Sequence, residues 1–453
     1  MPGMVDRILV PFEGAGSGVE DLTWGQIGLW QSTLADGRSR TTGGSAPLPP
    51  GATVESIVET LGYLVGRHQA LRTRLVFDAD GNARQSCSTS GEMPLEIYDA
   101  DGRDPAELAA EIEERYESTN FDYENEWPVR MAGIRIGDEI VHMIATYHHI
   151  VIDADGMKAL LADMFANERK PGPPTGIPPL EQARHQRTPA ARRQSDAAMR
   201  HLERVFRTMS ISRFGDPRKD GGPDCRQLRY RSPATLLAVR ATSAALGANT
   251  SAILLATFAV GLARFTGRNP VFAWLLVNNR FRTGYAESVS ALVQMSPFLI
   301  DVADTTLAEA VIRAQGGAMS AYKNAYYDPY QQDETIARLV AERGGTIDRS
   351  CYYNDRRLSE RDFTDEPVAG PDEITAAVAR AELSWPNEPA MPQQKMYCHV
   401  DDTPTTIDFT ISSDLRYFTE DEMVAVARGI EAVAVEMALD PTAPTDVALG
   451  VRS

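Results

Sequence analysis

The chain has 453 residues, with 63 acidic against 45 basic side chains and a formal net charge of -18. This excess of negative charge excludes general nucleic-acid binding and adhesion to anionic membranes. No apolar run is long enough to cross a bilayer, and the hydrophobic content of 43% is typical of a globular protein with a large core. The length corresponds to about two to three domains.

Cysteine usage and the N-terminus indicate a cytoplasmic protein. Because Asp6 and Arg7 precede the first short apolar run, we expect no secretory signal peptide. The cysteines lie far apart, form no CxxC pair and are typical of reduced, mostly buried thiols. They are Cys87, Cys225, Cys351 and Cys398.

The first section of the chain predicts helices over a mixed sheet. Thr23 and Gln26 have the spacing of a capping box at the start of a helix. Apolar residues at helical spacing predict a second helix over residues 54–65, after a Gly/Pro/Ser-rich loop at residues 43–51. The other predicted elements are strands at residues 7–12, 75–77, 83–87 and 140–147, a strand ending at residue 136, and helices at residues 105–119 and 157–166.

A proline-rich segment at residues 170–189 divides the chain. We therefore predict an N-terminal lobe at residues 1–172, a semi-rigid crossing at 173–200 and a C-terminal lobe at 201–453. Seven arginines between residues 184 and 207 form a basic stretch. Such a stretch fits either a solvated helix face or a dock for an acidic partner.

The second section mixes helices and strands in the same way, so the predicted fold class is α/β (α+β). Asn249 and Gly267 stand where the N-cap and C-cap of an apolar helix over residues 251–265 are expected. The other predicted helices are residues 234–246, 306–327, 329–342 and 420–438, and the predicted strands are residues 271–277, 292–302, 349–353, 394–400 and 405–412. Only the first section has two adjacent histidines, so one active site is expected.

Residues 147–156 read Tyr-His-His-Ile-Val-Ile-Asp-Ala-Asp-Gly and join a predicted strand to a predicted helix. Such a junction holds side chains rigidly, as catalysis requires. Adjacent strand residues point to opposite faces, so one of His148 and His149 can face a cleft while the other packs behind it. A lone histidine after an apolar strand is ordinarily a core residue, but the pair followed by two acids and a glycine makes a functional site an equal alternative.

A metal site built from the two histidines and a carboxylate is another functional reading. It is disfavoured because neighbouring strand side chains diverge. His142 is six strand residues from His148, about 20 Å, which is too far to share a metal. We therefore predict no metal.

Several stretches resemble the motifs of one family, and they occur in its order. Residues 148–153 resemble the signature HHxxxDG, and residues 67–75 resemble RHExLRTxF, with Gln69 for Glu and Leu75 for Phe. These motifs belong to the condensation domains of nonribosomal peptide synthetases, within the superfamily of chloramphenicol acetyltransferase-like acyltransferases. Further matches to the family are residues 22–26, 121–122, 128–130, 250–267 and 279–280.

The signature is not complete, because Ala154 stands where the family has glycine and Gly156 follows two residues later. Either Asp153 is the family's aspartate and the turn is altered, or Asp155 and Gly156 are the pair after a two-residue insertion. The spacing from His149 favours Asp153.

The resemblance implies two chloramphenicol acetyltransferase-like lobes, each a mixed sheet covered by helices, arranged as a V with a central tunnel. The phosphopantetheine arm of an acyl or peptidyl carrier protein would deliver substrate into the tunnel, so no bound cofactor is expected. Because no adenylation or carrier domain is visible, we expect a free-standing enzyme of natural-product or antibiotic biosynthesis. It would act in trans.

The resemblance also implies roles for individual residues. His149 would act as general base or positioning residue, with His148 packed behind it. Asp153 would be structural and paired with an arginine, for which Arg72 is the expected partner. Backbone amides near Gly156 would stabilise an oxyanion.

Three further residues complete the predicted site. Asn279 and Arg280 are expected either at the interface between the lobes or in a capped loop, and Trp24 is expected at the interface or tunnel.

Three functions remain open at this stage. The first is formation of an amide or ester from a carrier-bound acyl thioester and an amine or alcohol. The second is an acyltransferase that uses acyl-CoA, and the third is a non-catalytic recruitment module with the condensation fold. A carrier-dependent enzyme should use free CoA thioesters poorly, and a recruitment module should keep partner binding when His149 is replaced.

Overall fold

The structure is a computed structural model that describes residues 5–166, 169, 172–357, 368–386 and 394–448. Contacts divide these residues into two compact units. Unit 1 holds the described part of Met1–Ser195 with Asn278–Gln294 and Tyr326–Pro329. Unit 2 holds Asp196–Val277, Met295–Ala325 and the described part of Tyr330–Ser453. The expected V and tunnel stay predictions.

These units differ from the predicted sequential lobes at 1–172 and 201–453. Residues 278–294 and 326–329, from the second half of the chain, belong to unit 1. Most of the predicted crossing at 173–200 also belongs to unit 1, where it forms α5 (Pro179–Gln186) and the start of α6 (Pro189–Thr208). A proline-rich composition indicates a boundary along the chain, but it carries no information about which segments distant in sequence pack together.

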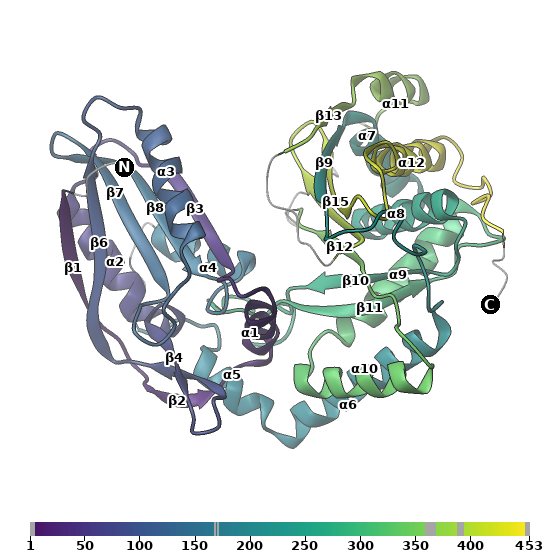
Figure 1. Ribbon diagram of the computed structural model, residues 1–453. Coiled ribbons are helices and arrows are strands. Elements are labelled where there is room, and N and C mark those ends of the chain that lie inside the picture. The colour runs from purple at the N-terminus through teal and green to yellow at the C-terminus, as the bar shows by residue number, and fades with distance from the viewer. Residues whose placement is uncertain (1–4, 167–168, 170–171, 358–367, 387–393, 449–453) are drawn as a thin grey trace. The chain divides into compact units, whose positions relative to one another are not determined.

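The main sheet of unit 1 has the strand order β1-β6-β7-β8-β3, and β6 and β7 are its parallel pair. Helix α2 (Val54–Arg67) covers one face through an apolar cluster, and α3 (Pro105–Ser118) covers part of the other (Figure 1). The strands are β1 (Asp6–Glu13), β3 (Thr41–Pro47), β6 (Ser90–Asp99), β7 (Val129–Ile136) and β8 (Glu139–His148).

The loop predicted at residues 43–51 is wrong over its first half, which belongs to β3. Thr41 to Pro47 pair antiparallel with β8 as far as His148. Gly43 is required there, because its φ is 145° and a Cβ would come within 2.1 Å of the Ala145 carbonyl oxygen. Pairing with a neighbouring strand overrides the weak strand propensity of a Gly-rich sequence.

A second sheet of unit 1 has the strand order β2-β5-β4, in which β4 and β5 form the predicted hairpin. Its strands are β2 (Gly18–Asp21), β4 (Thr73–Phe77) and β5 (Ala83–Cys87), and the short helix η1 (Gln69–Arg72) precedes β4. Helix α1 (Trp24–Asp36) begins with the predicted capping box, in which Thr23 and Gln26 bind each other's backbone.

The helix predicted at residues 157–166 is α4 (Ala154–Met164), and it begins three residues earlier than predicted. Its N-cap is Asp153, whose side chain accepts the Gly156 N–H at 2.8 Å. The spacing of apolar residues predicted the helix, but the N-cap Asp153 determines where it begins.

Unit 2 is built on a sheet with the order β11-β10-β12-β14-β15-β9-β13. One large apolar cluster joins the sheet to its helices. The predicted caps Asn249 and Gly267 of α8 (Thr250–Thr266) are confirmed. The other helices are α7 (Pro233–Leu246), α9 (Leu307–Lys323), α10 (Pro329–Glu342), α11 (Pro371–Ala377), η2 (Val378–Arg380) and α12 (Glu420–Leu439).

The strands of this sheet include two that the sequence analysis did not predict, β9 (Cys225–Ser232) and β13 (Glu382–Ser384). The others are β10 (Val271–Val277), β11 (Gln294–Ile300), β12 (Cys351–Asp355), β14 (Met396–Asp402) and β15 (Ile407–Asp414). The mixed α/β class is therefore confirmed.

No single helix in the described ranges is long and apolar enough to cross a membrane. Helices α7 and α8 meet the criteria of length and composition only as a pair, with a bend of 115°.

Candidate active site around His149

His149 is half-buried at the end of β8, and its imidazole has a fixed orientation. Its Nδ1 lies 2.7 Å from the Ile152 carbonyl oxygen. A carbonyl oxygen can only accept, so Nδ1 carries a proton, and in the neutral ring Nε2 is the nitrogen with the free lone pair. The backbone N–H of His149 also donates to the Arg40 carbonyl oxygen at 2.8 Å. These two contacts fix the orientation of the imidazole and of the backbone at this position.

His148 lies behind His149 and is sealed from water. It is 1% exposed, and the rings of Phe121 and Tyr123 contact its ring edge-on at centroid distances of 5.2 and 5.1 Å. Neither ring nitrogen has a hydrogen-bond partner among the described residues. Burial lowers the pKa of His148 to about 3, so the ring is neutral. The burial of His148 fits the packing role predicted for it, and a position of His149 facing a tunnel stays a prediction.

Asp153 lies at the start of α4 and is ion-paired with Arg280, at 2.7 Å. Its second oxygen also accepts the backbone N–H groups of Leu292 and Val293, at 2.8 and 3.1 Å. Both side chains are almost completely buried. The carboxylate therefore ties the turn after the histidines to residues 278–294 within unit 1.

The predicted pairing of Asp153 with Arg72 is wrong. Arg72 is fully buried, at the end of η1, and has no carboxylate partner among the residues described. Carbonyl groups satisfy the charge of this guanidinium, which therefore links the backbone before β2 to the backbone after β5. The groups that accept from it are the carbonyl oxygens of Ala15, Gly16 and Ser88 and the Sγ of Cys87.

Arg280 also anchors its own segment. Its Nη2 donates to the carbonyl oxygens of Ser288 and Ser290, each at 3.1 Å. Asn279, in the left-handed conformation, donates to the Leu292 carbonyl oxygen at 2.9 Å. Of the two roles predicted for Asn279 and Arg280, these contacts fit the capped loop, and a role between lobes stays a prediction.

Gly156 is required at the first turn of α4 by close packing. A Cβ there would lie 2.9 Å from the Ser290 carbonyl oxygen and 3.0 Å from Arg280 Nη2. The N–H of Gly156 is already bound by Asp153, so this amide is not free to hold an oxyanion. Gly156, two residues after the position of the signature's glycine, therefore allows close packing against residues 278–294. Ala154 occupies the first position of the helix.

Trp24 lies in an aromatic cluster of unit 1. Its backbone N–H donates to Gln186 Oε1 at 3.0 Å, and its ring centroid is 4.8 Å from that of Tyr326. Tyr326 binds Gln186 and Tyr285 through its hydroxyl, at 2.7 and 2.9 Å. The predicted place of Trp24 at a tunnel stays a prediction.

The far end of α4 is held by a second charged cluster. Asp163 binds Arg67 Nε at 2.7 Å and lies 3.1 Å from His68 Nε2. Burial lowers the pKa of His68 to about 4, so it is neutral at pH 7. In the motif at residues 67–75, it is therefore Arg67, and not Arg72, that reaches the helix after the histidines.

The basic stretch at residues 184–207 is partly paired. Arg184 and Arg187 bind Glu20, and Arg207 binds Glu342. These pairs are exposed and contribute little stability. Docking of an acidic partner on this stretch stays a prediction.

Sequence reasoning missed the residues that position the histidines. Phe121 and Tyr123 hold His148, and the backbone of residues 288–293 surrounds Asp153. Phe121 belongs to a recognised motif, which was a usable signal. Backbone groups of residues 288–293 leave no such signal in side-chain identity.

Groups of three or more His, Cys, Asp or Glu side chains that could hold a metal ion do not occur in the part of the chain that the structure describes. In the described residues the four cysteines form no disulfide, and three of the four are buried, as expected.

Comparison with known proteins gives a consistent result. The family model of the condensation domain matches residues 26–337. No curated protein sequence matches the chain.

Among solved structures, the chain is similar to the first condensation domain of the calcium-dependent antibiotic synthetase, in complex with a substrate analogue (TM-score 0.69, 16% identity, 96% of this chain and 100% of that chain). It is also similar to a structure that concerns condensation domain-mediated chain release from the enacyloxin polyketide synthase (TM-score 0.69, 17% identity, 97% of this chain and 86% of that chain). A third similar chain comes from the complex of the X-domain and OxyB from teicoplanin biosynthesis (TM-score 0.71, 16% identity, 100% of this chain and 100% of that chain). At these identities the likeness establishes the fold.

The matched residues make up more than half of the chain, and they include the histidine pair, Asp153 and Arg280. The chain therefore belongs to the condensation-domain family.

Proposed function

We propose that this protein is a condensation enzyme that forms an amide or ester bond between a carrier-protein-bound acyl thioester and an amine or hydroxyl acceptor. The observation that carries the proposal is the fixed imidazole of His149. Its Nδ1 is bound to the Ile152 carbonyl oxygen, which leaves Nε2 as the base. Nε2 has no partner among the described residues, so it is available to an acceptor.

In the proposed reaction, His149 Nε2 first accepts a proton and later gives it up. The acceptor nitrogen or oxygen attacks the thioester carbonyl carbon as His149 Nε2 takes its proton. The tetrahedral intermediate then collapses, the C–S bond breaks, and the thiolate leaves as the thiol with that proton. A positioned base of this kind is typically worth about 10² to 10⁴ in rate.

Family membership supports delivery of the acyl group by a carrier protein. In the proposal, the phosphopantetheine arm of that carrier is part of the substrate, and the enzyme needs no cofactor of its own. The acceptor is a small amine or alcohol, either free or bound to a second carrier. One similar structure concerns chain release by a condensation domain, which fits a free acceptor.

The experiment is intact-mass spectrometry of an acyl-loaded carrier protein incubated with candidate acceptors. We expect loss of the acyl group with appearance of a condensed product, and loss of that product with His149→Ala. Glu139→Ala, at an exposed position at the opposite end of β8, is the control and should keep full turnover.

Two other outcomes would overturn the proposal in different ways. Turnover of acyl-CoA but not of acyl-carrier would identify an acyl-CoA-dependent acyltransferase. A stable complex with a partner, unchanged by His149→Ala and without turnover, would identify a recruitment module.

The recruitment module is the second candidate function. A similar structure is a complex of an X-domain with OxyB, so this fold can bind a partner protein. Ala154 at the signature's glycine position also favours it. Against it, His149 retains the orientation of a base, with Asp153 and Arg280 holding the turn that follows.

A further inference from the structure

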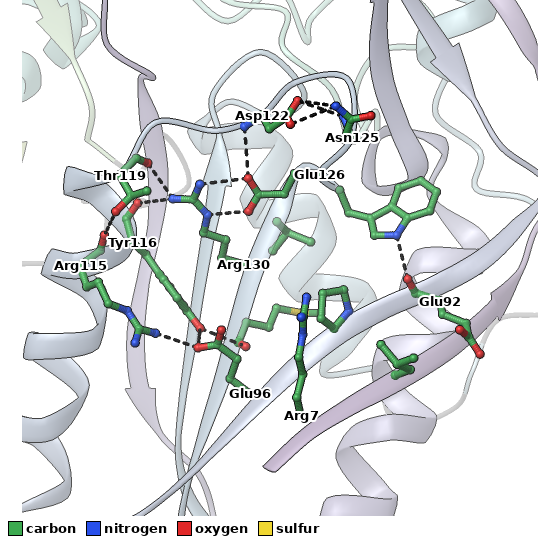
Figure 2. A pocket seen from close by; sticks show the side chains of 15 residues that line it. Arg7, Glu92, Glu96, Arg115, Tyr116, Thr119, Asp122, Asn125, Glu126 and Arg130 are labelled. Atoms are coloured by element: carbon green, nitrogen blue, oxygen red, sulfur yellow. Dashed lines mark hydrogen bonds and ion pairs between the residues drawn. The ribbon is translucent and has the colours of Figure 1, made fainter. Parts of the chain in front are cut away.

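A groove of about 640 Å³ lies in unit 1 away from the His149 site (Figure 2). Helix α3 packs over β7, β8, β3 and the end of β6 at Tyr98, and it leaves β1 and the earlier part of β6 open on the same face. The open strands form the floor, and α3 with the loop that follows it forms one wall. Trp127 also lines the groove, and its Nε1 donates to the Glu92 carbonyl oxygen at 2.8 Å.

Two of the three arginines that line the groove are already paired. Arg115 binds Glu96 at 2.7 Å. Arg130 binds Glu126 at 2.7 Å, and it also donates to three backbone carbonyl oxygens. These contacts build the wall and leave little charge to attract a ligand.

Two groups of opposite charge remain without a partner among the described residues, Arg7 and the Glu92 carboxylate. Figure 2 shows Arg7 reaching into the groove between Glu96 and Glu92, with no interaction drawn to its guanidinium. The Glu92 backbone is bound by Trp127, but its carboxylate is not bound. Within the described ranges, the groove lining therefore offers one cation and one anion that have no ion-pair partner.

Strand register places these charges at the two ends of an apolar strip. Arg7 is opposite Glu96, Leu9 is opposite Pro94, and Pro11 is opposite Glu92. Positions that alternate along β1 lie on one face, so these pairs share the floor. Glu92 is four residues along the strands from Arg7, or about 13 Å. Leu9, between them, is 52% exposed although it is a large apolar side chain.

From this arrangement we infer that the groove binds a short peptide with free termini. Its carboxylate pairs with Arg7, its ammonium pairs with Glu92, and its apolar middle covers Leu9 and Pro94. An extended chain of about three residues spans about 10 Å, and the two protein side chains lean inward to meet its ends. The inference is independent of the reaction proposed for His149.

The charges of the lining argue against a polyanion. Three arginines and four acids, Glu92, Glu96, Asp122 and Glu126, give the lining a net charge of -1. A nucleotide or an inorganic phosphate would meet repulsion there, whereas a zwitterion meets one partner at each end.

Isothermal titration calorimetry of the full chain with trialanine tests the inference. We expect saturable binding at one site, weakened by about three- to fivefold by Arg7→Gln and by Glu92→Gln, as for partly exposed ion pairs. Arg38→Gln, at an exposed position outside the groove, should leave the dissociation constant unchanged.

Blocked peptides identify which end meets which residue. N-acetylated trialanine should bind equally well to wild type and Glu92→Gln, and C-amidated trialanine equally well to wild type and Arg7→Gln. The inference is overturned if trialanine does not bind, if a doubly blocked peptide binds as tightly as trialanine, or if neither substitution changes the affinity.

Discussion

The Asp153 carboxylate accepts from one side chain and three backbone amides, and its partner Arg280 is 127 positions away in the sequence. Both charges are removed from water. Loss of one partner leaves the other buried and unpaired, which costs more than the net worth of the pair. Loss of the ion pair should therefore lower the stability of the turn after His149 before it affects the reaction.

Arg280→Gln should lower the free energy of unfolding by about 3 to 5 kcal/mol, because it leaves the Asp153 charge without a cation. Chemical denaturation followed by circular dichroism measures this change. Lys158→Gln is the control, since Lys158 pairs with Asp155 at the surface and its loss should cost less than about 1 kcal/mol. Equal stability of the two variants would contradict the assigned role of Arg280.

The sequence correctly indicated that Asp153 is structural, but it could not identify the partner. Arg72 was the expected partner because it belongs to the motif at residues 67–75. Its charge is instead satisfied by carbonyl oxygens, which occur at every residue and leave no trace in a sequence. Arg280 was recognised in a motif of its own, but nothing in either motif states that the two meet.

His148 predicts a loss of stability on the acid side. Burial holds its pKa at about 3 in the folded protein, against about 6.5 in the unfolded chain. Between these values the unfolded chain binds a proton that the folded protein does not, so the free energy of unfolding falls as the pH falls below 6.5. At pH 5 the loss from this residue is about 2 kcal/mol.

Chemical denaturation at pH 7 and pH 5 tests this linkage. His148→Leu removes the titrating ring, so its free energy of unfolding should fall by about 2 kcal/mol less than that of the wild type between the two pH values. His185→Leu, which removes an exposed histidine, should follow the wild type. If all three proteins lose stability equally, burial of His148 is not the cause.

At the scale of elements, α4 shows how a helix start is fixed by its surroundings. Asp153 caps it, and Gly156 in its first turn lies against the Ser290 carbonyl oxygen and Arg280. The apolar pattern predicted the helix but not the start at Ala154. In the same way, β3 was predicted as a loop because its glycines are poor strand residues, and only β8 beside it makes them a strand.

Gly156→Ala should destabilise the protein by about 1 to 3 kcal/mol, because the new methyl group overlaps the Ser290 carbonyl oxygen and Arg280. Gly429→Ala, within α12, is the matched control: nothing lies within 4 Å of its Cβ position. It should stabilise the protein by about 0.4 to 1 kcal/mol. Thermal and chemical denaturation of the two variants should give changes of opposite sign, and changes of the same sign would contradict the close packing at Gly156.

At the scale of the whole molecule, the two units are not consecutive in the chain. Periodicity predicted most helices and strands correctly in both halves, since apolar spacing is a local property. The assignment of residues 278–294 to unit 1 depends on contacts with Asp153, with Gly25 and with Ile177, all far away in sequence. Segment pairing of this kind cannot be read from composition.

The last prediction concerns autonomous folding of unit 1. A fragment ending at Ser195 contains the histidine pair, but it lacks residues 278–294 and 326–329. Asp153 then has no cation, and the start of α1 loses the backbone of Ala291 against which Gly25 packs. We expect the fragment to show poor chemical-shift dispersion in two-dimensional amide NMR spectra. Co-expression with a fragment of residues 196–453 should restore dispersion, because it returns Arg280 and its segment. A well-dispersed spectrum from the first fragment alone would mean that residues 278–294 only cover a lobe that folds without them.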